Sequence, residues 1–416
     1  MLNRHQDRYM PLPLHGYAPD SDIVTPRLLS EVAARFDLVL LETPRGYAFP
    51  GSPERCVSRH VVRAHPAHVT APEASLWMVE RLAPGQASRR GIIGSLIARL
   101  ARDGLSWVPA PRAVRRPDRE TGDADPCTVL PQPLTAAHTS GPDSAQPHQK
   151  DEKPHMRAYV LDHAGFPWQV TPFIEGAPLP RPDYLGHGWR GAAVAACILD
   201  LVHAGGALET IPPAEHCDDG RQGVVAYVKH MVSVIAERHP GIRQRLAPVL
   251  PVMETLPDVL ASQPVVLAHG DLHPLNIIWK GDVPAPDTAH RDIPGTPGRE
   301  TTHHAIAGVI DWEFAGARPL LYDAANCVGC VGFEHPSGLR GPFVLGLVHT
   351  LHRGGISADM LRLLPDMVIA SRFGWLSEWL RKRDHEMLEM ELDYFDILVH
   401  QRRALADLWG TSGAAS

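Results

Sequence analysis

The sequence contains no uninterrupted apolar run near the ~18 residues that a membrane-spanning helix requires. Its first residues, MLNRHQDRYMPLPLHGY, also lack the continuous apolar core of a secretory signal. Nor is there a basic excess, because the net charge is -7 and the pI is about 6.4, whereas nucleic-acid-binding domains usually have a pI above ~9. These absences predict a cytoplasmic protein that binds neither a membrane nor a nucleic acid.

Cysteine is also scarce, with six residues in a chain of 416, which is too few for a disulfide scaffold. Cys327 and Cys330 form a C-x-x-C pair. A structural zinc site would need a second pair of ligands, and none occurs at a suggestive spacing. We therefore expect buried, reduced thiols.

The length and the order of the patterns predict two lobes, since single cores tend to divide beyond ~250 to 300 residues. Strand-like runs dominate the first part, with one helical stretch at Gly91–Gly104, and they are Leu38–Thr43, His60–His65, Ala158–His163 and Trp168–Ile174. Long helical patterns follow at Trp189–Ala204, Val224–Glu237 and Pro365–Leu408. We predict an α+β fold, with a small β-rich N-terminal lobe over residues 1–174 and a larger, mainly α lobe over 175–416.

Two segments interrupt these patterns, at about residues 115–154 and 281–304. Both are rich in Pro and polar residues and poor in large apolar ones, so burial cannot offset the entropy of ordering them. The first is predicted to be a mobile surface insertion in the N-terminal lobe. The second, between two strand-like runs, is predicted to be an enlarged hairpin loop.

Polar residues crowd between two apolar runs in VVLAHGDLHPLNIIWK, Val265–Lys280, where Asp271 and Asn276 share one turn. The two runs are predicted to be strands, Val265–Ala268 and Ile277–Trp279. A later run, AIAGVIDWEF, ends abruptly in Asp311, and a hairpin could bring this carboxylate beside the turn. Mg²⁺ takes hard oxygen ligands, usually one or two protein groups plus substrate phosphates. Asn276 and Asp311 suit that role, which leaves Asp271 for another task.

HGDLHPLN followed by VIDWE resembles the signature pair of the aminoglycoside phosphotransferase and choline kinase superfamily, small-molecule kinases with a protein-kinase-like fold of two lobes. The spacing from Asp271 to Asn276 also matches the protein-kinase pattern H-R-D-x-x-x-x-N. The resemblance extends from about Phe36 to Trp409, with the two segments above as departures. It implies a Mg²⁺-dependent transfer of the γ-phosphoryl group of ATP to a hydroxyl of an aminoglycoside-like, amino-sugar or amino-alcohol acceptor.

The resemblance implies a role for each residue of the two motifs. Asp271 would accept or orient the proton of the acceptor hydroxyl, while Asn276 and Asp311 would hold Mg²⁺ on the ATP phosphates, because this chemistry needs positioning and charge neutralisation. His269 would brace the loop, and Asp323 would be the buried acid that ties it down. From the residues themselves, His273 is interpreted as a loop brace, with a proton carrier as the alternative, and Glu313 as a group that supports the metal ligands. For Glu313 a surface ion pair is an equal alternative.

The nucleotide lobe departs from the family pattern. Arg63 is the best match for the basic residue that meets the phosphates, and its planar fork can clamp phosphate oxygens. The acid expected on the adjoining helix is absent from RRGIIGSLIARL, and Glu73 and Glu80 lie upstream of the expected place. The phosphate-covering loop, within TPRGYAFPGSPERC, lacks a regular G-x-G-x-x-G. The adenine is expected to contact backbone groups of Thr171, Phe173 and Glu175.

The acceptor side is predicted on the last helical stretch, where one flank carries Trp375, Glu378, Trp379 and Glu386. Aromatic rings beside carboxylates suit a cationic or sugar-like acceptor through cation–π contact and charge pairing. Ordinary helix packing explains the same pattern.

Two other functions are compatible with the sequence. A kinase-like fold that binds a nucleotide or a partner without catalysis would explain the irregular phosphate loop and the missing helix acid, although Asp271, Asn276 and Asp311 argue against it. A protein kinase is a weaker alternative, because no A-P-E element follows Asp311.

Overall fold

The computed structural model describes most of the chain, namely residues 24–42, 48–50, 55–67, 74–115, 158–177, 179–205, 220–281 and 305–411. The chain divides into two compact units, Met1–Gly91 with Arg112–Val170 and Ile92–Pro111 with Thr171–Ser416. The predicted lobe boundary between residues 174 and 175 stays a prediction. Apart from Arg115 and Gly281, the predicted insertions at 115–154 and 281–304 lie outside the described residues.

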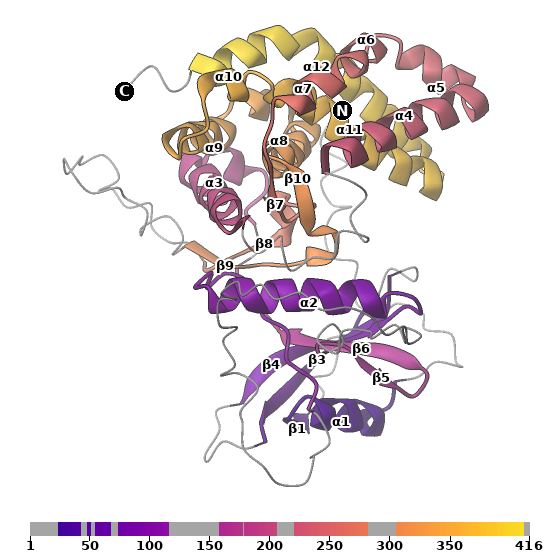
Figure 1. Cartoon of the computed structure of the whole chain (residues 1–416), viewed down its shortest axis with the longest axis vertical. Helices are drawn as coiled ribbons and strands as arrows, with labels where there is room; N and C mark the ends of the chain where they lie inside the picture. The colour runs from indigo at the N-terminus through magenta and orange to yellow at the C-terminus, as the bar shows by residue number, and fades with distance from the viewer. Residues whose placement is uncertain are drawn as a thin grey trace, which may run out of the picture. The chain divides into compact units, whose positions relative to one another are not determined.

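The first unit is built on a six-stranded sheet in the order β1-β3-β4-β6-β5, with β2 paired to β3 (Figure 1). Its strands are β1 Leu38–Glu42, β2 Ala48–Pro50, β3 Cys56–Pro66, β4 Ser75–Leu82, β5 Leu161–His163 and β6 Phe166–Pro172. Strand β3 pairs antiparallel with β1, β2 and β4, and β5 pairs antiparallel with β6. Four of these strands overlap the predicted runs.

Strand β4 was not predicted from its sequence, SLWMVERL. The last four residues are all buried, including Glu80 and Arg81. A strand that is covered on both faces loses the alternation of apolar and polar residues by which strands are recognised. Strand β4, which precedes the long helix α2 (Ala87–Arg102), was therefore identified only from the structure.

One face of this sheet is filled by helix α1, Pro26–Arg35. The helix starts where the hydroxyl of Thr25 accepts a hydrogen bond from the N–H of Leu28 at 3.1 Å, with Pro26 in the first turn. Its apolar side packs into a core formed with the sheet by Leu29, Val32, Ala33, Phe36, Leu38, Val62, Ala64, Val79, Leu161, Trp168 and Val170.

The second unit is mainly helical and contains two small antiparallel sheets, β7–β10 and β8–β9 (Figure 1). The strands are β7 Val265–Ala268, β8 Ile277–Trp279, β9 Ile306–Val309 and β10 Gly316–Pro319, and β7 and β8 have the predicted bounds. The main helices are α3 Gly188–His203, α4 Gly220–Arg238, α8 Tyr322–Glu334, α9 Pro342–Arg353, α11 Leu364–Lys382 and α12 His385–Thr411, with short helices α5 Pro240–Arg245, α6 Leu250–Glu254, α7 Leu256–Ala261 and α10 Ala358–Leu361. The predicted α+β class is confirmed.

The prediction of one helix over Pro365–Leu408 was wrong, because the chain breaks between α11 and α12. Arg383 has the left-handed conformation (φ 56°), and its N–H donates to the carbonyl of Leu380 at 3.2 Å. The N–H of Asp384 donates to the carbonyl of Trp379 at 3.0 Å, so the last turn of α11 is closed. The Asp384 carboxylate then accepts from the N–H of Met387 at 3.1 Å and starts α12.

No helix in the described part of the chain is both long enough and apolar enough to cross a membrane.

Candidate active site

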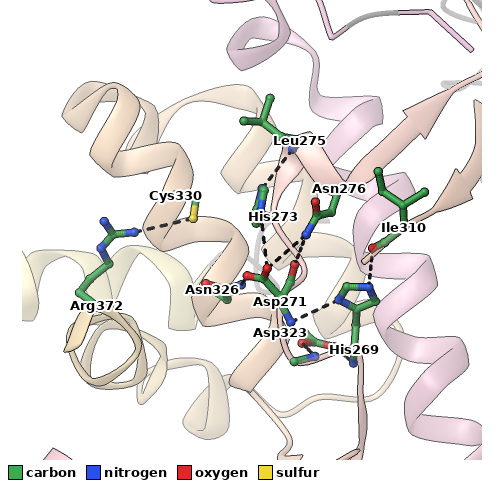
Figure 2. A network of polar contacts seen from close by, with 11 residues as sticks. His269, Asp271, His273, Leu275, Asn276, Ile310, Asp323, Asn326, Cys330 and Arg372 are labelled. Atoms are coloured by element: carbon green, nitrogen blue, oxygen red, sulfur yellow. Dashed lines mark hydrogen bonds and ion pairs between the residues drawn. The ribbon is translucent and has the colours of Figure 1, made fainter. Parts of the chain in front are cut away.

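The loop between β7 and β8 is braced by His269, which is fully buried (Figure 2). Its Nδ1 accepts a hydrogen bond from the N–H of Asp271 at 3.2 Å, so its Nε2–H donates to the carbonyl of Ile310 at 2.9 Å. An amide N–H can only donate and a carbonyl can only accept, so these two bonds select one neutral tautomer. Burial lowers the pKa of His269 to about 3. His269 thus joins the loop to Ile310 as a neutral residue, and its role as a brace stays a prediction.

Asp323, a buried residue of α8, anchors the backbone of the same loop. One carboxylate oxygen accepts from the N–H of His269 at 2.7 Å and the other from the N–H of Gly270 at 2.9 Å. Burial raises the pKa of Asp323 to about 6, although the two N–H donors act in the opposite direction. Gly270 has φ +84°, and a Cβ there would lie 2.2 Å from the backbone oxygen of Phe314.

Asp271 lies at the centre of the loop, and both of its carboxylate oxygens are oriented by amides (Figure 2). The Nδ2 of Asn276 donates to the Asp271 carbonyl at 2.9 Å and to its Oδ2 at 3.3 Å. The Nδ2 of Asn326 donates to Oδ1 at 3.3 Å. Sequence reasoning missed Asn326, although it follows Asp323 by three residues and therefore shares its face of α8.

Asp311 reaches the same place from the end of β9. The N–H of Ile310 donates to the carbonyl of Asn276 at 2.9 Å, so both backbone groups of Ile310 are bound to the loop. Asp311 itself is in the left-handed conformation (φ 60°, ψ 53°), which costs a non-glycine residue roughly 1–2 kcal/mol. Strain of this kind is concentrated at functional sites. The three predicted residues Asp271, Asn276 and Asp311 are thus brought together.

The site is rich in negative charge. Burial, together with the charges of Asp311 and Glu313, raises the pKa of Asp271 to about 7, although hydrogen bonds from Asn326 and Asn276 act in the opposite direction. Glu313 lies in the short 3-10 helix that follows Asp311, Trp312–Phe314, and is partly buried. A cation beside Asn276 and Asp311 would relieve this accumulation of charge.

His273 braces the other end of the loop. Its Nδ1 accepts from the N–H of Leu275 at 3.3 Å, and its Nε2 lies 3.9 Å from Oδ2 of Asp271. Burial lowers the pKa of His273 to about 4. Its ring meets the ring of Trp375 edge to face, with centroids 6.0 Å apart.

Of the four predicted acceptor residues, Trp375 is the one that the described contacts connect to Asp271, through His273. Its ring stacks on that of Trp379 at 5.5 Å, and the Trp379 indole N–H donates to a carboxylate oxygen of the buried Glu391 at 3.2 Å. Glu378 is occupied by Arg381 and Lys382, at 2.8 Å and 3.0 Å.

The last of these predicted residues, Glu386, is exposed and lies on α12, beyond the break that ends α11. The predicted acceptor flank is therefore not a single continuous helix face. Arg372 of α11 is buried, its guanidinium lies over the Trp375 ring at 5.6 Å from the centroid, and it donates to both oxygens of Glu391. It also donates to Cys330 (Figure 2).

The predicted nucleotide residues belong to different parts of the chain. Arg63 lies on β3, its side chain is 50% exposed, and its Nε is 3.3 Å from an oxygen of Glu42. Thr171 is near the end of β6, and Phe173 and Glu175 follow it. Residues 43–47 and 51–54 of the predicted phosphate-covering loop lie outside the described residues.

Within the described ranges, no group of three or more His, Cys, Asp or Glu residues could hold a metal ion. The predicted metal ligands, Asn276 with Asp311, number only two, and their role stays a prediction. Because the amide nitrogen of Asn276 is bound to Asp271, its carbonyl oxygen is the atom left for a cation. This set agrees with the small number of protein ligands that Mg²⁺ takes when substrate phosphates complete its shell.

Comparison with known proteins adds to this geometry. No curated protein matches the chain. An aminoglycoside phosphotransferase from Alicyclobacillus acidocaldarius subsp. acidocaldarius DSM 446 has 12% identity and a TM-score of 0.51, with 96% of this chain and 98% of that one covered. A choline/ethanolamine kinase family protein from Mesorhizobium loti has 14% identity and a TM-score of 0.46, with 93% and 99% covered. At 12% identity, the likeness to the first of these proteins concerns the fold alone, which is protein-kinase-like.

The family comparison is more specific than the structural one. The family described as the phosphotransferase enzyme family matches residues 77–285, half of the chain. The match includes the whole β7–β8 loop with Asp271 and Asn276. The chain belongs to this phosphotransferase enzyme family.

Proposed function

We propose that the protein transfers the γ-phosphoryl group of ATP, in the presence of Mg²⁺, to a hydroxyl group of a small molecule. The observation that carries this proposal is the position of Asp271, whose carboxylate is held by Asn276 and Asn326 beside Asp311. Phosphoryl transfer depends on positioning and on neutralising charge, and this arrangement has a group for each task.

Asp271 is the residue that would receive the acceptor hydroxyl. Two amide donors fix the plane of its carboxylate, so an incoming hydroxyl meets a group that is already oriented. The raised pKa of Asp271, about 7, also brings its carboxylate into the range in which a base can accept a proton at neutral pH. Neutral His269 and His273 hold the loop and take no proton.

Asn276 and Asp311 would hold Mg²⁺, through an amide oxygen and a carboxylate. When bound, the ion neutralises charge on the nucleotide phosphates. The backbone of Thr171, Phe173 and Glu175 is our proposal for the adenine contacts, and Arg63 stays a prediction for the phosphates.

For the acceptor we propose contact with Trp375, because its ring adjoins His273, which adjoins Asp271. Glu378 already binds two cations, which lower its pKa to about 2, so a cationic acceptor would have to compete with Arg381 and Lys382 there. An aminoglycoside-like, amino-sugar or amino-alcohol acceptor stays a prediction.

The test is release of ADP from ATP and Mg²⁺ by the purified protein, measured with a panel of hydroxyl-bearing small molecules. Asp271→Asn should abolish acceptor-dependent release and leave nucleotide binding intact, while Asp258→Asn, at an exposed position of α7, should change neither. Turnover that survives Asp271→Asn would contradict the proposed role.

A second function, nucleotide binding without catalysis, is favoured by one observation. Helix α2 contains no acidic residue, and a buried glutamate lies on the preceding strand instead. Nucleotide binding by the wild-type protein, without turnover on any acceptor or by water, would support this alternative.

A further inference from the structure

In the sheet of the first unit, one face of β3 and β4 packs against α1 and the other carries an ion pair. Val62 and Ala64 of β3 and Val79 of β4 point into the core with α1. Side chains alternate along a strand, so Arg59 and its register partner Glu80 point to the opposite face. With the α1 face filled and Glu80 itself buried, a ligand can reach this cluster at the partly exposed side chain of Arg59.

Glu80 is the centre of a cluster of charged groups on that face. The Nε of Arg59 donates to Oε1 of Glu80 at 2.9 Å, and an Nη of Arg90, on α2, lies 3.7 Å from the same oxygen. The exposed fractions of the side chains are 25% for Arg59, 9% for Glu80 and 7% for Arg90. Gln169 of β6 donates to the Arg90 carbonyl at 3.3 Å and fixes the start of α2. These contacts thus bring two guanidinium groups to one carboxylate.

In this cluster the acid lies on the strand and the base on the helix, which is the reverse of the arrangement in protein kinases. In protein kinases a strand lysine meets the phosphates and is oriented by a glutamate of the adjoining helix. Here β4, which leads directly into α2, has the acid Glu80, and α2 has Arg90 and no acidic residue. A carboxylate on the strand would repel phosphate oxygens, so the cation must come from another residue.

We propose that Arg59 contacts the nucleotide phosphates and that Glu80 positions it, together with Arg90. Of the two arginines, Arg59 is the one whose side chain is partly exposed, so a ligand can reach it. Its Nε bond to a buried carboxylate holds the planar guanidinium in one orientation. Arg63 lies on the same face four residues further along β3, but its partner Glu42 is itself exposed, so it lacks such an anchor. This inference rests on the proposed nucleotide-dependent function.

The experiment is isothermal titration calorimetry with ATP or GTP in Mg²⁺, whichever the wild-type protein binds more tightly, and with the matching nucleoside. Arg59→Gln should raise the Kd for the triphosphate about ten- to a hundredfold, because one charge-assisted contact is lost. The Kd for the nucleoside should not change, since it has no phosphates. Arg59→Lys keeps the positive charge but lacks the planar guanidinium, so its triphosphate Kd should lie between those of the wild-type protein and Arg59→Gln.

The matched control is Arg27→Gln. Arg27 also donates from Nε to a glutamate oxygen at 2.9 Å, but it lies on α1 and is 88% exposed. Its replacement should leave both Kd values unchanged. Thermal melting of each variant separates loss of binding from loss of folding.

The role of Glu80 is tested by exchanging the charges. Glu80→Arg and Arg90→Glu should each weaken triphosphate binding, and the double variant should restore most of it, because an acid–base pair is re-formed and the strand then supplies the cation. If the pair were purely structural, the double variant would recover the melting temperature. The triphosphate Kd would then be the same in the wild-type protein, the two single variants and the double variant.

The outcomes separate this inference from the proposed function. Absence of triphosphate binding by the wild-type protein would overturn both. If the wild-type protein binds the triphosphate and Arg59→Gln leaves its Kd unchanged, or if only Arg63→Gln raises that Kd, the assignment to Arg59 is overturned. The proposed function is not affected by either result. A rise in Kd shared equally by triphosphate and nucleoside would show a packing defect and would also overturn it.

Discussion

Gly270→Ala should disturb the loop that supports Asp271 at its tightest point. A Cβ at this position would lie 2.2 Å from the backbone oxygen of Phe314 and 2.7 Å from its carbon, and the backbone has φ +84°. Neither Phe314 atom can yield without moving the turn that begins at Asp311. The N–H of Gly270 also donates to Asp323 at 2.9 Å. The substitution therefore acts on two attachments of the loop.

The magnitude follows from three contributions. A positive φ costs alanine roughly 1–2 kcal/mol, and forcing a methyl group into a packed contact costs typically ~1–3 kcal/mol. Loss of the bond to the Asp323 carboxylate would cost about 1.5–3 kcal/mol. These contributions overlap, because the loop shift that relieves the clash also breaks the bond, so we expect the free energy of unfolding to fall by ~2–5 kcal/mol.

The assay is urea unfolding, combined with kcat for the acceptor found in the panel. Gly355→Ala is the control, because Gly355 has φ +99° in the same unit and a Cβ there would have no heavy atom within 4 Å. It should lose only the roughly 1–2 kcal/mol of backbone strain and keep its kcat. Equal losses of stability in the two variants would refute the argument from the Phe314 contact. An unchanged kcat in a destabilised Gly270→Ala would show that the loop does not position Asp271.

Three other predictions concern the same unit. Asn276→Ala and Asp311→Ala should each raise the Mg²⁺ concentration needed for half-maximal activity, since each removes one oxygen ligand; an unchanged requirement in both would exclude the metal site. Asn326→Ala should lower kcat and leave the nucleotide KM unchanged, because its bond at 3.3 Å orients Asp271; a change in nucleotide KM alone would argue against that role. Trp375→Ala should raise the acceptor KM without changing the nucleotide KM, and equal shifts in both would indicate a packing defect.

The parts of the fold and site that could be predicted are those encoded within a short stretch of chain. The apolar runs of β7 and β8 and the turn between them lie within sixteen residues, Val265–Lys280, and both strands have the predicted bounds. The spacing of Asp271 and Asn276 is likewise local, so their proximity follows from a single turn. To predict that Asp311 lies beside this turn, one further assumption was enough, namely the antiparallel pairing of β8 with β9.

Other features depend on residues that are distant in sequence. Asn326 is a candidate only once α8 lies under the loop, and Glu378 is seen to be occupied only when the rotamers of Arg381 and Lys382 are known. The end of α11 falls at RKRDHE, which has neither Gly nor Pro, because Arg383 takes the left-handed conformation there.

Strand β4 shows the limit most clearly. Its last four residues are buried on both faces and do not alternate, so its sequence alone does not distinguish a strand from a helix. Only pairing with β3 places Glu80 opposite Arg59, and only the start of α2 brings Arg90 to the same carboxylate. The sequence by itself determined the family and the proximity of Asp271 and Asn276 in one loop, because these depend on residue types at short spacing. The tertiary structure alone decided which charges meet, because burial and strand register act between segments that the chain order does not place together.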